Sequence, residues 1–170
     1  MADVERHEFF PTCIYRFKHN FKENELNNVV KHIEDNSLSE QNGQVVKRTG
    51  SQTQDELHKI DTFSNLTKTI IDVSKSILDE QGYMGEIEIT NMWGNILRPQ
   101  SQRAHAPHSH SNNFLSGVFY IKTSDDTSPI QFFDPRPQSS VLKPRKKEYN
   151  RLNSDICLLY TSDAADEPVC

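Results

Sequence analysis

Two histidines, His108 and His110, are the residues of this chain best suited to chemistry, because imidazole is a common ligand of transition metals. On an extended chain successive side chains point to opposite faces. His108 and His110 therefore share a face, with Cα atoms about 6.5 Å apart, while the nearby His105 points the other way. Two imidazoles so placed can bind one ion at about 2.0 to 2.2 Å per bond. The spacing predicts a metal site.

A bare His-x-His pair also has a simpler interpretation, a polar loop whose histidines face solvent. The residues after the pair favour the metal, because a ligand pair needs a rigid element behind it. Residues 114–121, FLSGVFYI, predict a strand, with Gly117 at a point where backbone or ligand approaches closely. Neutral imidazole binds Fe, Zn, Cu or Ni, so the pair alone does not choose the metal.

Further strands are expected around the pair. Apolar residues alternate with a period of two from residue 86, which predicts a strand over 86–95. Residues 130–133 predict another strand, joined to 114–121 by the Ser/Thr/Asp-rich loop 122–129. These strands would form the sheet that carries the histidines.

The N-terminal part predicts a short strand over residues 9–17 and then a helix over 24–35. One apolar stripe follows the helical period, at Leu26, Val29, Val30 and Ile33. Asn36 and Ser37 are suited to end this helix. Residues 45–57 suggest a short strand and a polar turn.

A second helix is predicted after residue 62. Its apolar face consists of Phe63, Leu66, Ile70, Val73 and Ile77. Thr62 is suited to cap its start, and Gly82 suits the left-handed position after its end. Because helices precede strands, we expect an α+β fold in which the helices cover one face of an antiparallel sheet.

Composition narrows the functional classes. The chain has 170 residues, which predicts one domain. Its formal charge of -5 argues against a nucleic-acid partner, and the basic run at 143–147 is interpreted as a solvated loop. No apolar run approaches the roughly 20 residues of a membrane helix, so we expect no membrane role. The first ten residues do not resemble a secretory signal, which favours a cytoplasmic location.

Four separated motifs stand in order in the second half: W-x-N at 93–95, P-H-x-H at 107–110, L-S-G-V-F-Y at 115–120 and F-x-D-P-R at 132–136. Together they resemble the motifs of 2-oxoglutarate/Fe(II)-dependent oxygenases of a type common in marine phage and bacterial genomes. The resemblance covers about residues 8–155. Four motifs in the right order are far more specific than one His-x-His pair.

The resemblance implies a double-stranded β-helix, or jelly roll, with Fe(II) and 2-oxoglutarate as cofactors. It makes His108 and His110 the first two metal ligands, although many relatives have a carboxylate where His110 stands. Asn95 and Tyr120 are candidates to hydrogen-bond the keto acid, with plain core packing as the alternative for the tyrosine. Arg136 is open between binding an anionic group and pairing with a neighbouring carboxylate.

The end of the chain departs from this family pattern. The family would supply a distal histidine ligand and then a basic residue for the far carboxylate of 2-oxoglutarate, but no histidine occurs after His110. Residues 157–170, CLLYTSDAADEPVC, resemble a translated sequencing adapter of the kind that ends metagenomic fragments. We therefore expect a C-terminally truncated oxygenase domain over residues 1–156, inactive as it stands, and a non-native tail over 157–170.

Two other functions stay open. One is a cupin-like metal-binding protein without a keto acid, although its usual nearby Glu is absent from residues 111–147. The other is a non-catalytic jelly-roll interaction module whose histidines bind nothing.

Overall fold

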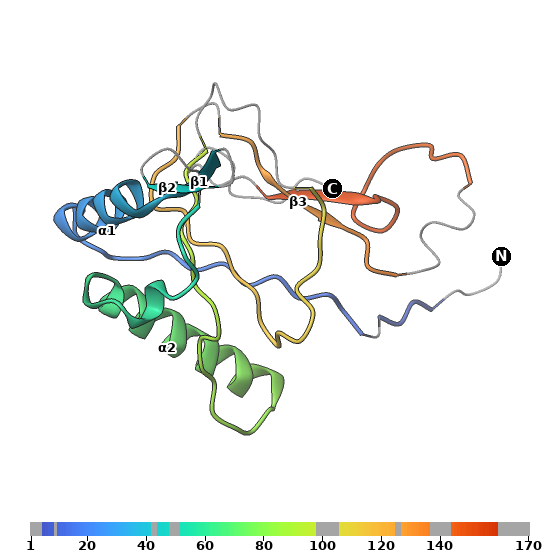
Figure 1. The fold of residues 1–170 in the computed structure, drawn as a ribbon. Coiled ribbons are helices and arrows are strands. Elements are labelled where there is room, and N and C mark those ends of the chain that lie inside the picture. The colour runs from blue at the N-terminus through green and yellow to red at the C-terminus, as the bar shows by residue number, and fades with distance from the viewer. Residues whose placement is uncertain are drawn as a thin grey trace. The chain divides into compact units, whose positions relative to one another are not determined.

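The computed structural model describes residues 5–8, 10–41, 44–47, 52–97, 106–124, 127–136 and 144–159. The chain divides into two compact units, Met1–Ser116 and Gly117–Cys170, and each is described by itself. The first contains α1 (Glu23–Asn36), β1 (Leu38–Gln41), β2 (Gln44–Lys47), the 3₁₀-helices η1 (Leu57–Lys59) and η2 (Asp61–Phe63), and α2 (Ser64–Gln81) (Figure 1). The second contains β3 (Ile130–Phe133) and β4 (Ile156–Leu159).

Helix α1 confirms the predicted stripe. Val29 and Ile33 are buried, and Leu26 and Val30 beside them are half-buried. The backbone N–H of Lys22 donates to the Glu25 carboxylate at 2.9 Å, which satisfies the group just before the first turn. The helix ends at Asn36, as predicted, and the Ser37 hydroxyl donates to the Ile33 carbonyl at 2.6 Å.

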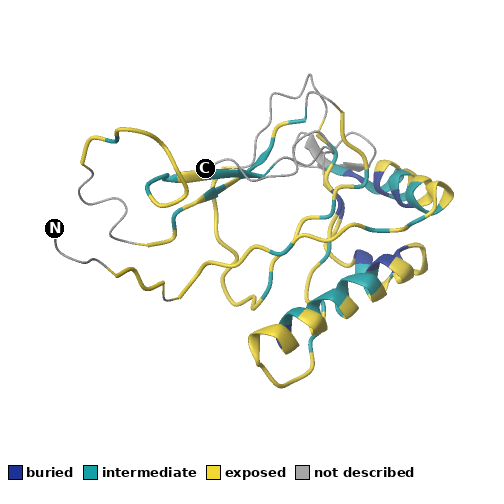
Figure 2. Ribbon diagram, turned by 180° about the vertical axis from the view of Figure 1, so that it is seen from behind, coloured by how far each residue is buried: buried dark blue, intermediate teal, exposed yellow. Residues whose placement is uncertain are grey.

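Helix α2 is also one-sided: half-buried (teal) and exposed (yellow) stretches alternate along it in Figure 2, and Leu66 and Leu78 are buried. Gly82 ends it with φ 74°, the left-handed conformation that was predicted. The prediction that Thr62 caps its start is wrong. Thr62 lies within η2, and the N–H of Ser64 donates to the Asp61 carbonyl, so a 3₁₀ turn precedes the helix in place of a side-chain cap.

The core of the first unit lies where η1 and η2 meet the helices. Phe63 in η2 is 1% exposed, and its ring meets His32 of α1 edge-on with centroids 5.3 Å apart. Both α1 and α2 contact η2, and α2 also contacts η1, where Leu57 is 3% exposed. The two helices are therefore joined through these short 3₁₀ turns.

The described residues form two sheets, each of two antiparallel strands. β1 pairs with β2 in the register Leu38↔Lys47, and β3 pairs with β4 in the register Ile130↔Leu159. These strands confirm the α+β class and the predictions of strands near 45 and over 130–133. Two paired strands are not a complete jelly roll, so the double-stranded β-helix and its helix-covered face stay predictions. The domain boundary expected after residue 156 falls within β4.

Three strand predictions are wrong for the described residues. Residues 10–17 form no strand, and Phe10 is 98% exposed with φ 55°. Residues 114–121 form none, and a Cβ built on Gly117 meets nothing within 4 Å, so no close approach occurs there. Over 86–95 exposed and half-buried side chains alternate as far as Thr90, the alternation shifts by one residue at Asn91, and only isolated bridges form, at Met92 and Asn95. Alternation sets which side chains are covered, whereas a strand also needs a hydrogen-bonded partner.

Among the helices that the structure describes, none has the length and apolar character needed to cross a membrane.

Candidate metal site

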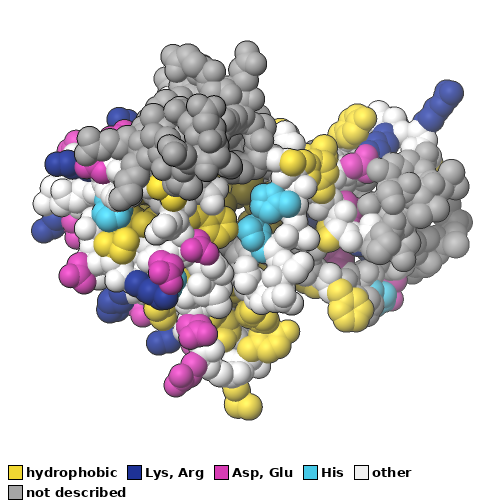
Figure 3. Space-filling view, in the orientation of Figure 1, with side chains coloured by type: hydrophobic (Ala, Val, Ile, Leu, Met, Phe, Trp, Pro, Cys, Tyr) yellow, Lys and Arg dark blue, Asp and Glu magenta, His cyan; other side chains and the backbone are white. Residues whose placement is uncertain are grey.

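The imidazole rings of His108 and His110 lie next to each other in the first unit. Their centroids are 4.9 Å apart and their planes meet at 69°. Both residues are exposed, on a segment that forms neither helix nor strand. Histidine side chains (cyan) sit together at the surface in Figure 3. The structure thus brings the two predicted ligands together without the rigid strand that was expected to hold them, and His105 lies outside the described residues.

A local hydrogen bond sets the tautomer of His108. Its Nδ1 lies 2.7 Å from the carbonyl oxygen of Ala106. A carbonyl only accepts, so Nδ1 carries the hydrogen and, in the neutral ring, Nε2 carries the lone pair. Metal-binding histidines commonly donate their other ring N–H to a backbone carbonyl in this way. In the neutral ring, the nitrogen of His108 that could accept a metal is therefore Nε2.

The ring separation fits two ligands on one ion. An ion about 2.1 Å from each nitrogen would lie about 3.2 Å from each ring centroid, so rings on neighbouring coordination positions would be roughly 4.5 to 5.2 Å apart. The observed 4.9 Å lies in this range. Among the residues that the structure describes, however, no group of three or more His, Cys, Asp or Glu side chains is placed to hold an ion. The described residues therefore offer two candidate ligands, whereas a facial triad needs three.

The segment Trp93–Asn95 lies beside this pair. The Trp93 and His110 rings are 6.1 Å apart between centroids, at an interplanar angle of 36°. Asn95 is exposed and forms an antiparallel bridge with Gln52 through its backbone. Asn95 is thus two residues along the chain from Trp93, whose ring contacts His110. The predicted contact of Asn95 with the keto acid would lie in this part of the chain.

Tyr120 belongs to the second unit, which is described separately. Its side chain is 37% exposed, and partial burial raises the pKa of the phenol above its ordinary value of 10.0. Loss of hydration penalises the phenolate, so the hydroxyl stays protonated and able to donate a hydrogen bond. The predicted role of Tyr120 toward the keto acid stays a prediction.

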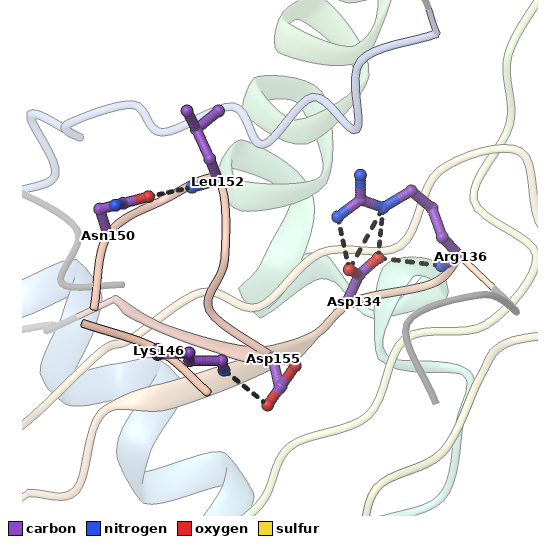
Figure 4. A network of polar contacts seen from close by, with 6 residues as sticks. All are labelled: Asp134, Arg136, Lys146, Asn150, Leu152 and Asp155. Atoms are coloured by element: carbon purple, nitrogen blue, oxygen red, sulfur yellow. Dashed lines mark hydrogen bonds and ion pairs between the residues drawn. The ribbon is translucent and has the colours of Figure 1, made fainter. Parts of the chain in front are cut away.

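Arg136 is paired with Asp134, the second of its two predicted possibilities (Figure 4). Its Nη2 donates to Asp134 Oδ2 at 2.6 Å and its Nε donates to Oδ1 at 2.9 Å, a bidentate contact that raises the pKa of the guanidinium. In the same unit the Lys146 amine lies 3.0 Å from Asp155 Oδ2, and the Asp134 N–H donates to the Asp155 carbonyl at 3.0 Å. These contacts tie together the chain at the ends of β3 and β4.

The sequence did not point to Thr53 as part of this region. Thr53 is 5% exposed, and its hydroxyl oxygen accepts a hydrogen bond from the Gly94 N–H at 3.0 Å. The surrounding run, SQTQDE, is polar throughout, so nothing in a single sequence marks this threonine as buried. The glycine between Trp93 and Asn95 was the available signal, because glycine often marks a close approach of another chain segment.

Comparison with known proteins gives one family match. Residues 91–163 match the model of a family described as "Putative 2OG-Fe(II) oxygenase". This stretch is less than half of the chain, and it contains Asn95, His108, His110 and Tyr120. No curated protein matches the chain, and no solved structure does. The stretch that carries the candidate site is therefore similar to the 2-oxoglutarate/Fe(II) oxygenases.

Proposed function

We propose that this chain carries part of the active site of a 2-oxoglutarate- and Fe(II)-dependent oxygenase that hydroxylates a substrate not yet identified. The observation that carries the proposal is the pair of adjacent imidazoles, one with its Nε2 left available by a local hydrogen bond, inside the stretch that matches the oxygenase family. Such a pair is the part of a facial triad that a short stretch of chain can supply.

In this proposal His108 binds the iron through Nε2 and His110 binds it from the neighbouring ring. Bound Fe(II) and 2-oxoglutarate would together supply the oxidising chemistry. Asn95 would donate a hydrogen bond to the keto acid from the segment next to His110. For Tyr120 the proposal rests on the sequence alone, which makes it a second hydrogen-bond donor to the keto acid, and its partly buried phenol is neutral at physiological pH. All four residues lie in the matched stretch.

Metal binding without oxygenation is the second candidate. It is favoured by the exposure of both histidines and by the lack of a third ligand close to them among the described residues. A cupin-like protein would bind its ion without a keto acid, so binding of 2-oxoglutarate separates the two candidates. A jelly-roll interaction module would bind neither.

Anaerobic calorimetry with Fe(II) tests the ligands. We expect His108→Ala and His110→Ala each to weaken Fe(II) binding by at least about tenfold, the loss that removal of even an outer partner of a metal ligand commonly causes. The matched control is His7→Ala, because the side chain of His7 is also well exposed, at 61%, and lies far away in the sequence. Equal affinity in all four proteins would rule out a metal site at this pair.

Binding of the keto acid is tested on the Fe(II)-loaded protein. We expect 2-oxoglutarate to bind only when Fe(II) is present and to produce the visible charge-transfer absorption of an iron-chelated keto acid. Succinate lacks the keto oxygen and serves as the control ligand. Fe(II) binding without any response to 2-oxoglutarate would favour the cupin-like alternative.

A further inference from the structure

Both backbone polar groups of Gly94, its N–H and its carbonyl, form hydrogen bonds with Thr53. Thr53 donates its N–H to the Gly94 carbonyl at 3.0 Å, and its hydroxyl oxygen accepts from the Gly94 N–H at 3.0 Å. Gly94 is buried and Thr53 is 5% exposed, so water does not compete for these bonds. Thr53 therefore fixes both polar groups of Gly94.

Helix α1 covers the same point. A Cβ built on Gly94 would lie 2.7 Å from both Cγ1 and Cδ1 of Ile33, which is closer than side chains tolerate. Ile33 is itself 5% exposed. The segment 93–95 is thus pressed against α1 at its middle residue and has no freedom to move inward.

We call Gly94 and the Thr53 that binds it the anchor. The residues on either side of Gly94 are exposed. Trp93 and Asn95 are exposed while Gly94 between them is buried, the alternation expected of an extended chain. The Trp93 ring lies 6.1 Å from the His110 ring, within the usual range for a packed aromatic pair. The side chain of Trp93 therefore connects Gly94, which Thr53 fixes, to the ring of His110.

We propose that Thr53 and Trp93 are positioning residues of the metal site. Thr53 fixes Gly94, Gly94 fixes the direction of Trp93, and Trp93 forms a wall that restricts the ring of His110 next to His108. This inference rests on the proposed metal site, but it makes its own claim: the ring of His110 is oriented before any metal binds. Such orientation lowers the entropic cost of closing the ligand pair on an ion.

The metal-free protein tests the anchor. In NMR spectra we expect nuclear Overhauser contacts between the indole of Trp93 and the ring of His110 in the wild type and in Thr53→Ser, which keeps the hydroxyl. Thr53→Val keeps the shape but removes the acceptor for Gly94, and there the contacts should disappear while the α1 and α2 signals remain. Unchanged contacts in Thr53→Val, or no contacts in the wild type, would overturn the inference.

A second variant changes a residue that is not part of the buried core. The side chain of Trp93 is 37% exposed, so Trp93→Ala should fold even if Thr53→Val does not. We expect Trp93→Ala to weaken Ni(II) binding, measured by calorimetry, by about tenfold, and Trp93→Phe to restore most of it, as for other residues that orient metal ligands. Wild-type affinity in Trp93→Ala would reject the positioning role.

Fluorescence links the two proposals. Trp93 is the single tryptophan of the chain, so its emission reports on this site alone. We expect Ni(II) to quench it in the wild type with the affinity found by calorimetry, and His110→Ala to abolish the quenching. Binding at the histidines without quenching would overturn the positioning role and leave the metal site standing. Failure to bind Ni(II) or Fe(II) would overturn the metal site. The nuclear Overhauser contacts between Trp93 and His110 in the metal-free protein would still test whether Thr53 and Trp93 orient the ring of His110.

Discussion

The packing next to the candidate site requires a residue without a side chain at position 94. The hydrogen bonds of Gly94 to Thr53 and its contact with Ile33 leave no volume for a side chain. From the sequence alone, W-G-N could be recognised as a motif, but the residues that surround its glycine come from 41 to 61 positions away. A single sequence does not reveal such partners.

Replacing Gly94 by Ala should destabilise the protein by about 1 to 3 kcal/mol, because the added methyl group would overpack against Ile33. Urea denaturation of the two proteins measures the difference. Gly117→Ala is the matched control, since a Cβ there meets nothing within 4 Å. A Gly94→Ala protein as stable as Gly117→Ala would mean that Ile33 moves aside freely.

Tyr120 predicts how the protein responds to alkali. Its pKa is raised above 10.0 by burial, so the folded state holds the phenolic proton more tightly than the unfolded state does. This contribution is fully present below about pH 10 and is lost as the pH rises through the folded-state pKa. Tyr120→Phe should therefore lose less stability than the wild type between pH 9 and 11, measured as the melting temperature at each pH. Parallel curves for the two proteins would contradict the assignment.

At the scale of elements, helices were predicted better than strands for a physical reason. The apolar stripe of α1 and the glycine that ends α2 act within a few residues, so the sequence carries them locally. A strand depends on a partner elsewhere in the chain. Residues 86–90 have the alternation of a strand, with Ile87 and Ile89 half-buried, yet residues 86–95 share only isolated bridges with Gln52 and Glu56. The histidine pair was found because its spacing is local too.

The pairing of β3 with β4 predicts where the chain can be shortened. A chain of residues 1–159 keeps all four residue pairs, whereas a chain of residues 1–156 keeps only Phe133↔Ile156. We expect the shorter chain to show faster amide exchange over β3 than the chain of residues 1–159. Identical exchange would mean that 157–159 contribute nothing and would support a domain that ends at residue 156.

For the molecule as a whole, burial is unevenly distributed along the chain. The buried apolar residues of the described parts all belong to the first unit: Val29, Ile33, Leu57, Phe63, Leu66 and Leu78. In the second unit, β3 and β4 are half-buried or exposed, with Phe133 47% exposed. Stability is therefore expected to concentrate around η1, η2 and the two helices.

Hydrogen exchange followed by mass spectrometry tests this distribution. Amides of α1 and α2 should be the slowest to exchange, because opening them exposes the buried core, and amides of β3 and β4 should exchange faster. The exchange rates of the helices and strands are compared within one sample, so that pH and temperature are the same for all of them. Protection in β3 and β4 equal to that in α2 would show that the second unit is stabilised by contacts other than apolar burial.

The hydrogen bond between His108 and Ala106 has a consequence for how the candidate site could arise. The hydrogen bond that decides which ring nitrogen keeps its lone pair lies within three consecutive residues, 106–108. A short synthetic peptide with this stretch should then favour the same proton placement, which nitrogen-15 chemical shifts can read directly. The tautomer that leaves Nε2 of His108 able to accept a metal would then not depend on the rest of the fold.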